Sequence, residues 1–175
     1  MKKFTIVLVA LLAMSGMATA QENSQESTVE QDETSYNIQD EFFGCKLGKS
    51  DMEEVKSTLQ AHKLTVAESE DSYVAMDVTL NGFKFSAALF QFNELGVLNS
   101  VTFLNSGLSR SEALDFGQAI YTALNSKYIM IKRVIDGLDC YFSSSNDITC
   151  QLSTQASDET YFVRLDYQVG TAILK

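Results

Sequence analysis

Only one histidine, His62, is available in the chain to act as a catalytic base. It stands beside Lys63 at the expected end of a helix, where an exposed polar residue caps the helix far more often than it catalyses a reaction. The sequence contains no set of His and Cys residues at zinc spacing, no glycine-rich phosphate loop and no Gly-x-Ser-x-Gly nucleophile elbow. We therefore predict no catalytic residue and no cofactor, and we do not expect an enzyme.

Acidic residues are the other group that could support chemistry, because carboxylates bind hard cations and catalyse glycoside hydrolysis. Glu68, Glu70, Asp71 and Asp77 lie close together in the sequence, but their spacing matches no EF-hand loop. A solvated turn explains them better than a calcium site. No pair of carboxylates is singled out for glycoside chemistry, and the chain has no tryptophan to stack on a sugar. We therefore predict no metal site.

The three cysteines are Cys45, Cys140 and Cys150. Cys140 and Cys150 flank a polar, serine-rich turn, and pairing Phe142 with Ile148 across that turn places the two cysteines opposite each other. This pattern predicts a disulfide between Cys140 and Cys150, which would contribute about 3 kcal/mol by closing a short loop. Cys45 is left over. A buried, small apolar residue is the interpretation we favour, and a reactive or intermolecular thiol is the alternative.

Residues 1–20 have the features of a secretory signal peptide. Two lysines at positions 2 and 3 precede an apolar run over residues 4–12, and Ala18-Thr19-Ala20 matches the small-x-small pattern of a cleavage site. The apolar run is shorter than the roughly 20 residues that span a membrane. We expect an exported, periplasmic or extracellular protein with no membrane span after cleavage, and disulfides form in such compartments. An uncleaved N-terminal anchor is the alternative.

Negative charge is concentrated after the predicted cleavage site. Residues 21–41 contain seven acidic residues and no lysine or arginine, and we expect them to form a flexible acidic leader. The whole chain has 13 basic and 23 acidic residues, a net charge of −10. This balance argues against binding to nucleic acid or to an anionic membrane surface. It would steer a cationic partner towards the protein, although solubility alone also explains it.

Two helix starts share the same capping signature. Ser50 with Glu53, and Ser109 with Glu112, each form the capping-box pattern in which a serine is followed by glutamate three residues later. Both are followed by apolar residues at helical spacing and then by segments that alternate between apolar and polar residues. Asn81-Gly82 between two such segments is a strong signal for a tight β-hairpin.

The repeated order of one helix and several strands predicts an α+β fold made of two tandem units, residues 42–107 and 108–175. In each unit we expect one helix packed on a three- or four-stranded antiparallel sheet, with the two sheets joined edge to edge or packed together.

The first helix start also resembles a known type of protein. Residues 43–50, followed by Glu53, Val55 and Leu59, resemble the opening segment of small exported bacterial proteins. These proteins are of the beta-lactamase-inhibitor-protein-like and outer-membrane-assembly-lipoprotein-like type. The resemblance implies a helical segment packed on an antiparallel sheet, sometimes in tandem. A tandem cystatin-like arrangement predicts almost the same order of elements.

Aromatic residues are frequent in the predicted strands, and most of them must form the core. Those that could form an exposed patch for a partner are Phe83, Phe85, Phe90, Phe92 and Phe162. We therefore expect a secreted or periplasmic, non-catalytic binding module that recognises a protein partner through a sheet surface. The alternatives are a binder of small molecules or envelope glycans that uses the cleft between the two units, and a structural envelope protein held by its acidic leader.

Overall fold

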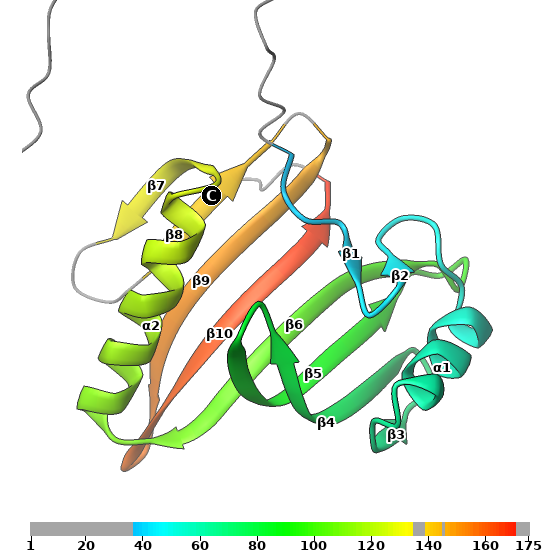
Figure 1. The fold of residues 1–175 in the computed structure, drawn as a ribbon, viewed down its shortest axis with the longest axis horizontal. Helices are drawn as coiled ribbons and strands as arrows, with labels where there is room; N and C mark the ends of the chain where they lie inside the picture. Colours follow the sequence, from blue (N-terminus) through cyan, green and yellow to red (C-terminus); the bar gives the residue numbers. More distant parts are fainter. Residues whose placement is uncertain (1–36, 135–138, 145, 171–175) are drawn as a thin grey trace, which may run out of the picture. The chain divides into compact units, whose positions relative to one another are not determined.

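The computed structural model describes residues 37–134, 139–144 and 146–170 (Figure 1). All of them belong to one of the two units of the chain, Thr34–Lys175. The predicted signal peptide, most of the predicted acidic leader and residues 135–138, 145 and 171–175 lie outside the described residues. The folded part includes residues before Phe42, because Ile38 is buried.

The described elements comprise two helices and ten strands. Their bounds, in chain order, are β1 (Glu41–Phe42), β2 (Cys45–Lys46), α1 (Met52–Ala61), β3 (Val66–Glu68), β4 (Ser72–Leu80), β5 (Phe83–Phe92), β6 (Leu98–Leu108), α2 (Arg110–Asn125), β7 (Ile129–Val134), β8 (Asp139–Ser143), β9 (Ile148–Ser157) and β10 (Thr160–Val169).

Eight of the strands form one continuous antiparallel sheet in the order β3-β4-β5-β6-β10-β9-β8-β7. The strands β3 to β6 follow α1, and the strands β7 to β10 follow α2. The last strand of each set, β6 and β10, pair with each other, so that Phe103 lies opposite Leu165. Strands far apart in the sequence therefore become neighbours at the centre of the sheet.

The prediction of two tandem helix-on-sheet units is wrong, because the described residues form mostly strand and share one large sheet. The pairing of β6 with β10 supplies hydrogen-bond partners to two strands that would otherwise be edges of separate sheets, and an unpaired edge is unfavourable. The two helices also pack against non-equivalent elements. Helix α2 packs on β6, β9 and β10, whereas the main contact of α1 is with β2.

The core lies on one face of this sheet. Figure 1 shows both helices and the short β1–β2 ribbon on that side. Val55 and Leu59 of α1 and Ile120 of α2 are buried there. The strands contribute a row of residues that lie opposite one another from β5 to β9 and are all buried, namely Ala88, Phe103, Leu165 and Leu152.

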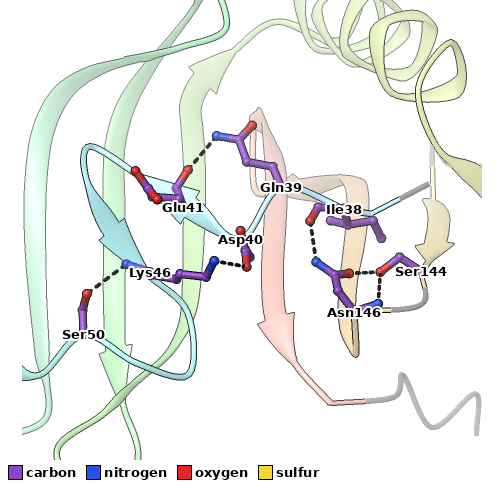
Figure 2. Close-up of polar contacts among 8 residues, drawn as sticks. All are labelled: Ile38, Gln39, Asp40, Glu41, Lys46, Ser50, Ser144 and Asn146. Atoms are coloured by element: carbon purple, nitrogen blue, oxygen red, sulfur yellow. Dashed lines mark hydrogen bonds and ion pairs between the residues drawn. The ribbon is translucent and has the colours of Figure 1, made fainter. Parts of the chain in front are cut away.

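A strap formed by residues 37–50 crosses the covered face. At one end, the carbonyl oxygen of Ile38 accepts a hydrogen bond from the side chain of Asn146 at 2.9 Å. At the other end, the backbone N–H of Lys46 donates to the hydroxyl of Ser50 at 2.9 Å, and its side chain lies 3.2 Å from Asp40. Figure 2 shows these contacts, which connect the turn between β8 and β9 with the start of α1.

The predicted capping box of α2 is confirmed. The hydroxyl of Ser109 accepts a hydrogen bond from the backbone N–H of Glu112, and the side chain of Glu112 accepts one from the backbone N–H of Ser109. The capping box predicted at Ser50 and Glu53 is wrong, because the N-cap of α1 is Asp51. Its side chain accepts a hydrogen bond from the backbone N–H of Glu54 at 2.9 Å. Ser50 is buried, and its hydroxyl instead accepts a hydrogen bond from the backbone N–H of Lys46 within the strap.

The register of β8 and β9 differs from the predicted one. Phe142 lies opposite Cys150, and Cys140 lies opposite Leu152, so the two cysteines are offset along the sheet and do not face each other. The structure contains Cys45, Cys140 and Cys150 as buried thiols. Burial raises the pKa of the Cys45 and Cys150 thiols, and the thiol form reacts much more slowly than the thiolate.

The burial of all three cysteines predicts how their thiols react. Without a reducing agent, we expect the folded protein to react with none of its cysteines on addition of a water-soluble aromatic disulfide, and to show three reactive thiols after unfolding in urea. A Gln118→Cys variant, which places a thiol at an exposed position of α2, is the control and should react at once. A single reactive thiol in the unfolded wild type would mean that Cys140 and Cys150 are joined.

Candidate binding face

The second face of the sheet is covered by neither of the two described helices nor by the β1–β2 ribbon (Figure 1). Side chains of the central strands alternate between the two faces, so the neighbours of the core residues point to this side. Across β5, β6 and β10, the row Leu89, Thr102 and Asp166 lies beside the buried row of the core. We call this surface the open face.

An apolar hollow of about 480 Å³ lies on the open face across β4, β5, β6 and β10. Val74 lies opposite Leu89, and Ala87 lies opposite Leu104, so apolar side chains from three neighbouring strands meet there. The hollow is lined by Val74, Ala87, Leu89, Gln91, Thr102, Leu104, Phe162 and Arg164. Apart from three polar residues at one side, its lining is apolar.

A polar hollow of about 270 Å³ adjoins it over β5, β6, β9 and β10. Its lining residues are Gln91, Phe92, Asn99, Ser100, Thr102, Gln151, Arg164, Asp166 and Gln168. Gln91, Thr102 and Arg164 line both hollows. The open face therefore offers an apolar depression next to one that is rich in amide groups, and a single ligand could contact both.

A polar network occupies the boundary between the two hollows. The Nε of Arg164 donates to Asp166 Oδ1 at 2.8 Å and lies 2.7 Å from Asp166 Oδ2. The hydroxyl of Thr102 donates to the same Oδ1 atom at 2.5 Å. Thr102 and Asp166 are 64 residues apart in the sequence and meet only because β6 pairs with β10. Sequence reasoning missed all three residues, because each is an ordinary polar residue of an alternating strand.

The structure places most of the predicted partner-binding aromatics in the core. Phe85, Phe90 and Phe92 are 3%, 0% and 8% exposed, which excludes them as major contacts for a partner. Phe83 is partly buried and packs against Phe116 of α2, with 6.0 Å between the ring centres. Phe162 lines the apolar hollow of the open face, and Phe92, although buried, contributes to the lining of the polar hollow.

A change of phase in β4 and β5 explains why these phenylalanines share one face. The buried positions of β5 are Phe85 and then Ala88, Phe90 and Phe92, so the alternation shifts by one residue between Phe85 and Ala88. In β4 the shift occurs at Asp77, which has a positive φ of 53°, a conformation that aspartate tolerates better than most residues. Regular alternation would have placed Phe85 and Phe90 on opposite faces.

Among the described residues, the other candidate groups do not come together in a site. His62 is exposed, and its ring lies 5.9 Å from that of Phe43. Within residues 37–134, 139–144 and 146–170, no cluster of three or more His, Cys, Asp or Glu residues could hold a metal ion. In the same residues, neither helix has the length and apolar character needed to cross a membrane.

Comparison with known proteins identifies no relative. No protein-family model, no curated protein and no solved structure matches the chain. The resemblance of residues 43–59 to the opening segment of small exported bacterial proteins therefore stays a prediction.

Proposed function

We propose that this chain is an exported, non-catalytic binding protein that holds a protein partner on the open face of its sheet. The observation that carries the proposal is the apolar hollow, which is lined by residues of four strands and is covered by neither described helix. Apolar depressions on a soluble protein are typical of surfaces that bind other molecules. The polar hollow beside it resembles the polar rim that surrounds the apolar centre of protein interfaces.

The shape of the site favours a protein over a small molecule. Pockets for small ligands enclose most of the ligand surface, whereas this depression opens along a sheet face and extends over four strands. A cavity between the β4–β5 hairpin and α2, where a cleft between the two halves would lie, has a volume of only about 80 Å³. Ligand pockets are typically about 300–1,000 Å³, so this cavity is too small for a metabolite or a sugar.

Charge indicates what kind of protein would bind. The chain has a net charge of −10, and exposed acidic residues lie in the turns beside the polar hollow. Asp71 lies at this edge, because its carbonyl oxygen accepts a hydrogen bond from the N–H of Phe92, one of the lining residues. Glu70 and Glu94 are exposed in the turns before β4 and after β5. A partner with basic residues around an apolar contact would be complementary to this surface.

A pair of matched baits tests the proposal. Ala87→Arg places a long charged side chain in the apolar hollow, and Gln118→Arg adds the same charge to the exposed surface of α2. From an envelope extract, we expect the wild type and Gln118→Arg to retain the same basic protein and Ala87→Arg to lose it, with a reduction of at least about 100-fold in affinity when the purified pair is measured. Thermal unfolding of the three baits should agree within a few degrees.

The proposal fails if every protein retained by the wild type is also retained by Ala87→Arg while that variant remains folded. Stabilisation of the protein by an envelope glycan or a metabolite in a thermal-shift screen, without any protein partner, would favour the small-molecule alternative instead.

A further inference from the structure

Arg164 occupies the junction of the two hollows and lines both of them. Its Nε is held between the two carboxylate oxygens of Asp166, at 2.8 and 2.7 Å. Among the described residues, the hydrogen bonds and ion pairs of this guanidinium all use Nε, and its terminal nitrogens donate to no protein group. The side chain is 46% exposed, so these nitrogens are accessible from the open face.

We infer that Arg164 is the polar anchor of the open face, and that its terminal nitrogens donate to a main-chain carbonyl oxygen of the partner beside an apolar side chain that enters the apolar hollow. This inference rests on the proposed function and adds the chemistry by which the partner is recognised. The ligand class is a peptide loop with an exposed apolar residue. Arg164 supplies the directional contact, and the apolar hollow supplies the buried area.

A neutral acceptor fits this position better than a carboxylate. Asp166 already neutralises the charge of Arg164, and the rest of the chain is strongly acidic, so a further anion would be repelled. The neighbouring side chains Gln91, Gln151 and Gln168 are neutral amides. Each amide offers both donors and acceptors, which matches the N–H and C=O groups of a peptide backbone.

The guanidinium is also oriented before a partner binds. Asp166 receives hydrogen bonds from Arg164 and from the hydroxyl of Thr102, so its carboxylate is fixed from two strands. Thr102 is only 6% exposed and belongs to the rigid centre of the sheet. An anchor that is already in position loses less conformational entropy on binding, which increases affinity.

A library of random-sequence constrained loops displayed on phage provides the probe. Loops are selected on the purified wild-type protein, those that lose binding to Ala87→Arg are synthesised, and their dissociation constants are measured by fluorescence anisotropy. We expect the selected loops to share an apolar residue. Arg164→Ala should weaken their binding by about 10- to 100-fold, as expected for the loss of a hydrogen bond to a charged donor.

Three further variants separate the anchor from a general effect of charge. Lys84→Ala removes one positive charge from an exposed position of the same sheet outside both hollows, and it should change affinity by less than about 2-fold. Arg164→Lys keeps the charge but not the planar fork, and should bind about 10-fold more weakly than the wild type. Asp166→Asn should also weaken binding, because Arg164 is no longer oriented.

The possible results distinguish the anchor role of Arg164 from the proposed function. If the selected loops fail to bind Ala87→Arg but bind Arg164→Ala and Arg164→Lys as tightly as the wild type, the proposed function stands and the anchor role is wrong. Tighter binding by Asp166→Asn would show that the acceptor is a carboxylate and would overturn the assignment of a carbonyl. If no selected loop is sensitive to Ala87→Arg, both the anchor and the proposed function fail.

Discussion

Replacing Phe103 with alanine is expected to lower the free energy of unfolding by about 3–5 kcal/mol, the range for large-to-small changes of fully buried aromatics. Phe103 is 0% exposed, and its ring centre lies 5.4 Å from that of Phe85 and 5.5 Å from that of Phe42. It also packs on Tyr167 of β10 at 6.3 Å. The backbone on both sides is held by sheet hydrogen bonds, so the cavity cannot collapse easily.

Urea unfolding followed by circular dichroism measures this change. Phe103→Leu is the matched control, because it retains most of the volume and should cost less than half as much. A single transition is expected for every variant, since one core extends across both halves of the sheet. A loss below about 1 kcal/mol, or two separate transitions, would contradict a shared core centred on Phe103.

Replacing Phe162 with alanine is expected to have the opposite pattern, with a large loss of partner binding and little loss of stability. Phe162 lines the apolar hollow on the open face, and buried aromatics at the centre of an interface commonly contribute 2 kcal/mol or more. This corresponds to a reduction in affinity of about 30-fold or more. The free energy of unfolding should fall by no more than about 1 kcal/mol, because the side chain is only partly buried.

Calorimetry with the partner recovered by the wild-type bait, or with a selected loop, measures the affinity. Phe162→Leu keeps an apolar side chain and should retain part of the binding. Phe90→Ala is the contrasting variant, because Phe90 is 0% exposed on the covered face and its loss should reduce stability without changing the affinity of the folded protein. Equal binding by Phe162→Ala and the wild type would exclude the apolar hollow as the contact surface.

Features that depend on neighbouring residues were predictable. The capping box of Ser109 and Glu112 forms within one helical turn, and the structure confirms it. Asn81 and Gly82 both adopt positive φ, at 50° and 86°, and join β4 to β5 as the hairpin signal predicts. The exception is Ser50, whose capping pattern is equally good but whose hydroxyl binds Lys46 of the strap instead.

Features that depend on distant residues were not predictable. The paired phase changes, at Asp77 in β4 and between Phe85 and Ala88 in β5, decided which phenylalanines reach the core, and their pairing across the hairpin is a property of the folded sheet. The register of β8 and β9 decided that Cys140 and Cys150 do not face each other. A shift of two residues keeps every side chain on the same face, so hydrophobic alternation alone could not distinguish the predicted register from the observed one.

By itself, the sequence determined the two helices, the tight hairpin and the excess of acidic charge, because each depends on residue type and short-range spacing. Only the tertiary structure decided that β6 pairs with β10, and this one pairing joins the halves into a single sheet. It also brings Thr102 to Asp166, which orients Arg164, and so creates the open face with its two hollows. Contacts between strands so far apart in the chain leave no local pattern, because their energy comes from hydrogen bonds and burial that exist only after folding.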